Sequence, residues 1–197
     1  VRLSHSGLPP RAQEERRRDS HHHRAVHVRP STLGRLSGRL RPWLPERAGP
    51  GNESTLEAAG QEISTFLRCY RYLLGDASKP HFDRSDCRCE EGTNALSSFS
   101  AYSLLFYVGS ECEGGATTFF EPDASIALSG KGLTPCCERS RLRASASVEP
   151  RAGDVLVFPH GRHPGCHPNP LHEGSEVTRG EKLLVRTDVM YRASAMK

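Results

Sequence analysis

Two short stretches about ninety residues apart carry side chains that can bind a metal ion. His81 and Asp83 stand two residues apart, and His172 follows much later in the chain. Two imidazoles and one carboxylate can occupy one face of a metal and leave the other face open, which suits a non-haem Fe(II) oxygenase site. Lys182 comes ten residues after His172 and offers a cation to an acidic co-substrate. If these groups converge, the pattern predicts oxygen chemistry.

Convergence requires strands that carry these residues. Successive side chains alternate along a strand, so a strand beginning near Lys79 would place His81 and Asp83 on the same side. His172 must then come from a neighbouring strand. Apolar or alternating runs predict strands at 67–72, 79–83, 100–108, 116–120, 155–158 and 182–191. Many short strands with turns between them and little helix indicate a mainly β sandwich or barrel.

The segments between these runs have less regular patterns. A short helix is expected over 54–67, with Ser54 as its N-cap and Glu57 completing a capping box. The polar stretch 86–98 is expected to be a loop. Residues 121–147 resemble an insertion, and a loop rich in Gly, His and Pro covers 159–170.

Positive charge is concentrated at the N-terminal end. Residues 1–50 contain eleven Arg and four acids, a balance of +7, whereas the whole chain carries +4, so the remainder carries −3. This stretch is rich in Arg, His, Pro and Ser and lacks a sustained apolar period. We therefore expect a basic, disordered segment over 1–52, and a folded domain over 53–197.

The apolar residues and the cysteines indicate the kind of cellular compartment in which the protein is expected. No apolar run approaches the about 20 residues that span a bilayer, so no membrane span is expected. The seven Cys are odd in number and match no zinc signature. They favour free thiols in a reducing compartment, cytoplasmic or nuclear. A second metal site built from Cys87, Cys89, Cys136, Cys137 and Cys166 is the alternative.

From about Leu67 to Arg192, two thirds of the chain, the sequence resembles the 2-oxoglutarate/Fe(II)-dependent dioxygenase superfamily, in its prolyl 4-hydroxylase-like branch. The matching stretches occur in the family's order and are RYLLGDASKPHFDRS, SLLFYVGSECEGGATTFF, EPRAGDVLVFPHG and LHEGSEVTRGEKLLVRTDVMYR. The resemblance implies a double-stranded β-helix, a jelly-roll or cupin-like barrel of two facing antiparallel sheets with a few flanking helices. Residues 53–197 would be the dioxygenase domain.

The resemblance also implies roles for individual residues. The implied iron ligands are His81, Asp83 and His172, and no further catalytic residue is assigned. Lys182 is the implied partner of the distal carboxylate of 2-oxoglutarate. Arg186 is the alternative, since it faces the same side of the strand and can form a bidentate carboxylate pair. Tyr72 and Ser103 match positions where the family often places hydroxyls near the co-substrate.

The activity implied by the resemblance is hydroxylation of a protein or peptide side chain, with proline as the expected residue. Fe(II) would be the metal, 2-oxoglutarate the co-substrate and ascorbate the reductant, and succinate and CO2 would be released. His160 follows an expected strand and could be mistaken for the distal ligand. His172 is preferred because Val177, Gly180 and Lys182 follow it in the family's pattern.

Two other functions stay open. Ser78 stands where the family commonly has a Tyr, three places before His81. This departure motivates a degenerate, non-catalytic barrel that serves as a binding module. The Arg-rich N-terminal segment motivates a nucleic-acid oxidative demethylase on the same fold. A nucleic-acid partner is not expected, because the basic stretch looks separate from the barrel.

Overall fold

The computed structural model describes residues 22–46, 48–49, 62–89, 92, 96–121, 139–161 and 166–192. Eleven strands dominate this part of the chain, with one α-helix and two short 3-10 helices. The elements in chain order are β1 (His22–His27), α2 (Pro30–Leu40), η1 (Arg41–Trp43), β2 (Glu62–Ile63), β3 (Phe66–Tyr72), β4 (Ser78–His81), β5 (Cys87–Cys89), β6 (Leu96–Gly114), β7 (Thr117–Phe120), η2 (Arg139–Arg141), β8 (Ala144–Val148), β9 (Val155–Pro159), β10 (His172–Gly174) and β11 (Val177–Arg192).

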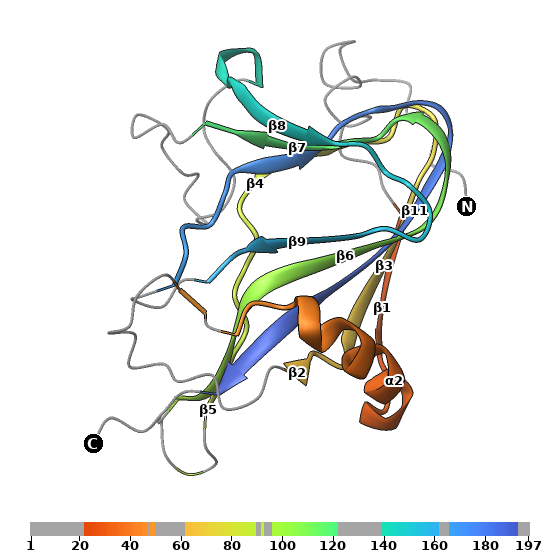
Figure 1. The fold of residues 1–197 in the computed structure, drawn as a ribbon. Helices are drawn as coiled ribbons and strands as arrows, with labels where there is room; N and C mark the ends of the chain where they lie inside the picture. The colour runs from red at the N-terminus through yellow and green to blue at the C-terminus, as the bar shows by residue number, and fades with distance from the viewer. Residues whose placement is uncertain are drawn as a thin grey trace.

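The strands form two facing sheets (Figure 1). The larger sheet has the order β1-β3-β11-β6-β5, with β2 added on β11 and β9 on β6. The smaller sheet has the order β4-β10-β7-β8. Neighbouring strands pair antiparallel, and strands distant in sequence lie side by side in both sheets. This arrangement confirms the predicted mainly β fold, a double-stranded β-helix.

Two long strands form the centre of the larger sheet. β6 and β11 pair from Val177 opposite Gly114 to Arg192 opposite Ser98, with three shifts of register on the way. Gly180, close to the start of this ladder, has a φ of 75°. A Cβ at this position would lie 1.9 Å from the carbonyl oxygen of Glu111, so no other residue fits there without moving the backbone. The sequence pattern had predicted 100–108 in the middle of β6 and 182–191 in the C-terminal part of β11, but not the full length of either strand.

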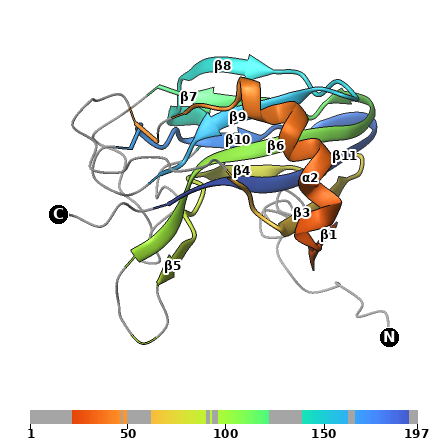
Figure 2. The same ribbon diagram turned by 60° about the horizontal axis from the view of Figure 1, so that its bottom comes forward.

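Helix α2 covers part of the outer face of the larger sheet (Figure 2). Its Leu33 is buried and joins a cluster that includes Phe99, Leu104, Val189 and Tyr191 from β6 and β11. Strand β1 pairs with β3 over six residues. Residues 22–46 are therefore ordered, in contrast to the disorder expected for segment 1–52. Residues 1–21 lie outside the described part, and the domain boundary at residue 52 stays a prediction.

Three further expectations need comment. The helix predicted over 54–67 is wrong for its last residues, since Glu62–Ile63 form β2 and Phe66 begins β3; residues 54–61 lie outside the described part. The loop predicted over 86–98 is wrong at 87–89 and 96–98, where β5 pairs with the start of β6, while residues 90, 91 and 93–95 lie outside the described part. Within 121–147, residues 144–147 belong to β8, and 122–138 are not described.

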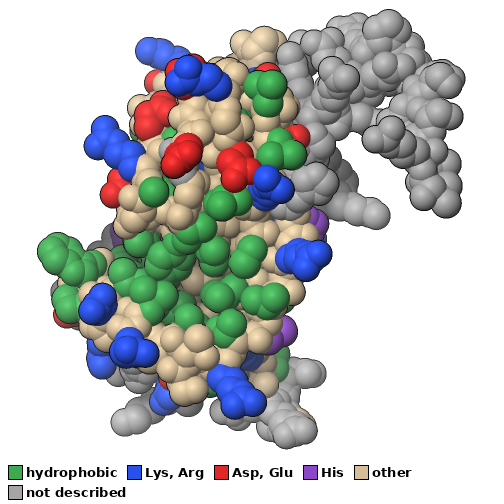
Figure 3. Space-filling view, turned by 90° about the vertical axis from the view of Figure 1, so that its right-hand side faces the viewer, with side chains coloured by type: hydrophobic (Ala, Val, Ile, Leu, Met, Phe, Trp, Pro, Cys, Tyr) green, Lys and Arg blue, Asp and Glu red, His purple; other side chains and the backbone are tan. Residues whose placement is uncertain are grey.

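The surface of the protein carries apolar side chains as well as charge. Hydrophobic side chains gather in the middle of the face shown in Figure 3, with Lys and Arg side chains around them. The exposed large hydrophobic residues of the described part are Val26, Trp43, Leu74, Val108 and Val155. Within the described residues, we find no helix with the length and apolar character needed to cross a membrane.

Candidate metal centre and co-substrate cavity

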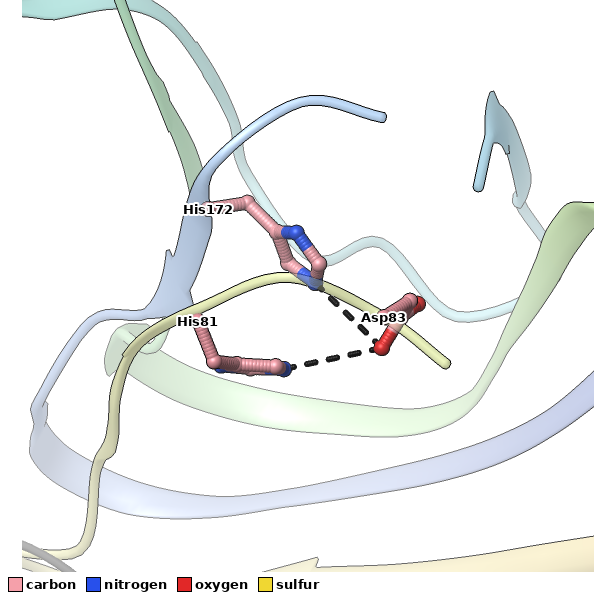
Figure 4. Close-up of side chains that lie close together, drawn as sticks. All are labelled: His81, Asp83 and His172. Carbon is pink, nitrogen blue, oxygen red and sulfur yellow. Dashed lines mark ion pairs between the residues drawn. The ribbon is translucent and has the colours of Figure 1, made fainter. Parts of the chain in front are cut away.

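The three predicted metal ligands meet between the two sheets (Figure 4). His81 ends β4, Asp83 follows two residues later, and His172 begins β10, which pairs with β4 so that His172 lies opposite His81. The Nε2 atoms of His81 and His172 lie 3.6 and 3.8 Å from Oδ1 of Asp83. Two ligands bound to one metal at about 2.1 Å can be at most about 4.2 Å apart, so both carboxylate–imidazole distances suit a shared ion. All three donor atoms lie within 4.8 Å of one another.

Backbone carbonyls fix the orientation of both imidazoles. Nδ1 of His81 donates to the carbonyl oxygen of Lys79 at 2.7 Å, and Nδ1 of His172 donates to that of Pro170 at 3.1 Å. A carbonyl can only accept, so both rings carry their hydrogen on Nδ1. Each Nε2 therefore keeps a free lone pair that points toward Asp83, which is the tautomer a metal needs.

The electrostatics of the site keep the ligands in metal-binding form. Burial alone would raise the pKa of Asp83, but Arg186, with His81 and His172, holds that pKa well below its usual value. Burial lowers the pKa of His172 to about 4, against the opposing effect of Asp83. The carboxylate is therefore ionised and the distal imidazole neutral at ordinary pH, and neither ligand needs to lose a proton to bind a metal.

Arg186 lies on the same side of the metal site as Asp83. Its Nη1 is 2.8 Å from Oδ1 of Asp83, and its Nη2 is 3.5 Å from Oδ1 of Asp188. Burial opposes the charge of Arg186, but the two carboxylates raise its pKa. A carboxylate oxygen has two lone pairs, so Oδ1 of Asp83 can hold both the guanidinium and a metal ion.

Lys182 lines the same cavity as Asp83 and Arg186 and is only 1% exposed. Its Nζ donates to the carbonyl oxygen of Gly115 at 2.5 Å and lies 4.8 Å from the centre of the Tyr72 ring. Within the described residues, no carboxylate forms an ion pair with Lys182. Burial lowers the pKa of this amine to about 8. The site thus contains a desolvated amine, and the charges of Cys112 and Glu149 offset the effect of burial only in part.

Gly114 and Gly115 make room for this cation. Both have a φ of 72°, which favours glycine. A Cβ on Gly115 would lie 3.2 Å from Cδ of Lys182, and one on Gly114 would lie 2.4 Å from the carbonyl oxygen of Glu176. The double glycine therefore lets the backbone bend so that a carbonyl reaches the amine.

One cavity of about 450 Å³ joins the metal ligands to the cation. His81, Asp83, His172, Tyr72, Lys182 and Arg186 all line it. The remaining lining residues are Arg68, Tyr70, Ser78, Phe82, Arg84, Leu105, Thr117, Glu173, Gly174 and Leu184. The cavity thus combines a candidate metal position with a buried cation in one lining, which suits a small dianion that contacts both.

The family model of the 2OG-Fe(II) oxygenase superfamily matches residues 67–187, more than half of the chain. The chain belongs to the 2OG-Fe(II) oxygenase superfamily. The predicted family is therefore confirmed, and with it the oxidoreductase class and the support for Fe(II) and 2-oxoglutarate at the site. No curated protein sequence matches the chain significantly.

Prolyl hydroxylases are among the solved structures that match this oxygenase. A structure of the viral collagen prolyl hydroxylase from Paramecium Bursaria Chlorella virus-1 has a TM-score of 0.50 at 16% identity, over 86% of this chain and 74% of that chain. A 2OG complex of the same viral enzyme has a TM-score of 0.48 at 15% identity, and the match covers 87% of this chain and 79% of that chain. A Pseudomonas putida prolyl-4-hydroxylase has a TM-score of 0.37 at 16% sequence identity, and the match covers 88% of this chain and 94% of that chain. The first of these supports the fold.

In this oxygenase, Ser103 occupies a different place from the one expected. It is fully buried on β6 and does not belong to the cavity lining; its hydroxyl donates to Oδ2 of Asp83 at 2.5 Å. His160, the alternative distal ligand, lies behind Ser103, with its Nδ1 2.6 Å from that hydroxyl. The structure thus brings His172, and not His160, to the metal-binding face.

Sequence reasoning missed the residues that surround the ligands. The ion pair between Arg139 and Glu173 joins η2 to β10, at 2.8 Å, one residue after His172. Asn169 donates from Nδ2 to the carbonyl oxygen of Asp83 at 2.8 Å. Neither contact follows a sequence period, because both join segments that only the fold brings together.

Proposed function

We propose that this oxygenase uses Fe(II) and 2-oxoglutarate to hydroxylate a protein or peptide side chain, with proline as the first residue to test. The observation that carries the proposal is Lys182, a buried cation in the cavity that also contains His81, Asp83 and His172. A buried charge is costly without a counter-ion, so the cavity favours an anionic ligand that reaches the amine.

In this proposal, His81, Asp83 and His172 hold the metal through Nε2, Oδ1 and Nε2. Fe(II) bound there, with 2-oxoglutarate and O2 as co-substrates, supplies the oxidising chemistry that converts a C–H bond to C–OH and leaves succinate and CO2. Three protein ligands leave open positions for the co-substrates. The protein itself binds, orients and shields the reactants.

Lys182 is proposed to bind the distal carboxylate of 2-oxoglutarate. Arg186, the alternative predicted from sequence, already pairs with Asp83 and Asp188. Its charge is therefore engaged beside the metal, whereas Lys182 donates to a carbonyl and lies over the rings of Tyr72 and Tyr107. An ion pair formed in this partly closed space would be stronger than one in bulk water.

Tyr72 is proposed to form a wall of the co-substrate pocket. Its ring lies beneath the Lys182 amine, and burial raises the pKa of its hydroxyl, so the phenol stays protonated and can donate to a carboxylate. The notion of proline as substrate rests on the sequence resemblance and on the names of the structural neighbours, which are prolyl hydroxylases. A protein or peptide is accordingly the proposed partner.

The test is turnover of 2-oxoglutarate by the purified protein with Fe(II), ascorbate and a panel of proline-containing peptides. We expect succinate to form in step with a peptide that gains one oxygen atom by mass spectrometry. Lys182→Met should keep the metal but lose succinate formation. A metal-loaded protein that forms no succinate with any peptide would contradict the proposal and would favour a binding module.

A further inference from the structure

A fully buried polar cluster lies behind Asp83, on the side away from the cavity. Ser100 and Ser103 come from β6 and His160 follows β9, and none of the three is exposed to solvent. Ser103 Oγ lies 2.5 Å from Oδ2 of Asp83 and 2.6 Å from Nδ1 of His160. Nε2 of His160 lies 2.8 Å from Oγ of Ser100. The groups form one continuous row of short hydrogen bonds that ends on a metal ligand.

The number of hydrogens that each group can donate fixes the donor and the acceptor of each hydrogen bond in this row. The hydroxyl of Ser103 donates its single hydrogen to Oδ2 of Asp83, while Oδ1 of the same carboxyl group pairs with Arg186. Ser103 can then only accept from His160, which must carry its hydrogen on Nδ1. Burial lowers the pKa of His160, which favours the neutral ring, and its Nε2 accepts from the hydroxyl of Ser100.

The two oxygens of Asp83 consequently have different partners. Oδ1 faces both imidazole Nε2 atoms and Arg186, whereas Oδ2 accepts from Ser103. A carboxylate that holds a metal through one oxygen needs the other to be fixed, or the group can rotate about its Cβ–Cγ bond. Asn169, which donates to the carbonyl oxygen of Asp83, holds the backbone of the same residue.

We propose that Ser103 and His160 are positioning residues that orient Asp83 for metal binding, acting in series from His160 through Ser103. The inference rests on the metal site of the proposed function. Outer hydrogen-bond partners of metal ligands commonly contribute 10- to 100-fold to metal affinity. His160 thus acts on the metal site through Ser103, without touching the metal or the cavity.

The experiment measures anaerobic Co²⁺ binding to the full chain, followed by visible absorption, in a set of matched variants. Ser103→Ala removes the donor to Oδ2. His160→Leu removes the donor to Ser103, whereas His160→Asn, of similar size, keeps a nitrogen donor attached to Cγ at the place of Nδ1. Thr187→Val is the control, because Thr187 is equally buried and its hydroxyl donates to the carbonyl oxygens of Ser64 and Phe66.

We expect Ser103→Ala and His160→Leu each to raise the Kd for Co²⁺ about tenfold. His160→Asn should stay within about threefold of wild type, as should Thr187→Val even where its melting temperature falls. The double variant Ser103→Ala/His160→Leu should bind no more weakly than Ser103→Ala alone, because residues in series do not add. A melting curve of each variant confirms that it is folded.

Three results would overturn the inference. The first is wild-type affinity in both Ser103→Ala and His160→Leu, and the second is a loss in Thr187→Val equal to theirs. The third is a double variant whose loss is the product of the two single losses. A wild-type protein that binds no Co²⁺ would overturn the proposed function as well, so the two failures are distinguishable.

Discussion

Replacing Lys182 with Met should make the protein more stable while it abolishes 2-oxoglutarate binding. Burial lowers the pKa of Lys182 from 10.5 to about 8, so the charged amine is less favourable in the folded state than in the unfolded state. At about 1.4 kcal/mol for each unit of pKa, this difference costs about 3 kcal/mol at pH 7. Met fills similar space without a charge.

The lost hydrogen bond to Gly115 offsets part of the stability that Lys182→Met gains by removing the buried charge. The carbonyl oxygen of Gly115 loses its donor in the variant, at a cost of about 1 kcal/mol. The net expectation is an increase of about 2 kcal/mol in the free energy of unfolding. For a domain of this size it corresponds to a rise of about 4–8 °C in melting temperature.

The stability difference between wild type and Lys182→Met should change with pH in a definite direction. Between pH 8 and 10.5 the unfolded state binds a proton on Lys182 that the folded state does not, so the wild type gains stability as the pH rises. The advantage of Lys182→Met should therefore be full below pH 8 and lost before pH 10.5, above which the missing donor to Gly115 should leave the variant about 1 kcal/mol less stable than wild type. Comparing the two proteins at each pH cancels the titration of all other groups.

The assay is thermal melting of metal-loaded protein with and without 2-oxoglutarate, at several pH values. At a concentration of 2-oxoglutarate one hundred times its Kd, the wild type should gain about 2.7 kcal/mol, and Lys182→Met should gain nothing. A variant that melts lower than wild type at pH 7, or that keeps the stabilisation by 2-oxoglutarate, would refute the reasoning about this cation.

Three further outcomes are expected. The KM for 2-oxoglutarate should rise about tenfold from pH 7 to pH 9, because the cationic fraction of an amine with a pKa of about 8 falls from nine tenths to one tenth; a flat profile in steady-state kinetics would contradict this. His172→Ala should abolish Co²⁺ binding, whereas His160→Ala should only weaken it, and equal losses in the titration would mean that the ligand assignment is wrong. Glu173→Gln should lower the melting temperature by a few degrees, because the pair with half-exposed Arg139 contributes about 1 kcal/mol; an unchanged melting temperature would show that this pair does not hold η2.

The sequence could single out His81 and Asp83 as candidate metal ligands because the constraint that joins them is local. His81 and Asp83 stand two residues apart, and this spacing is visible without a fold. His172 was chosen over His160 from the residues that follow it, and the structure brings His172 to the metal-binding face. The β class followed in the same way from alternating apolar runs, which record the burial of one face of a strand.

The N-terminal segment shows where the sequence pattern was insufficient. Arg and His dominate the residues around β1, and nothing in its composition indicates a strand. β1 forms nonetheless, because β3 presents a free edge over Phe66–Tyr72 that supplies its hydrogen bonds. An edge partner is a property of the sheet, and composition does not record it.

What the sequence by itself determined is the donor set, the cation that follows it and the β character of the domain. Only the tertiary structure shows how the two cations differ: Arg186 lies against Asp83 and Asp188, while Lys182 is buried in the lining of the same cavity and donates to a backbone carbonyl. It also placed Ser103 behind a metal ligand and away from the co-substrate pocket. Both outcomes depend on contacts between strands far apart in the chain, and such distances and burials exist only once the two sheets have packed face to face.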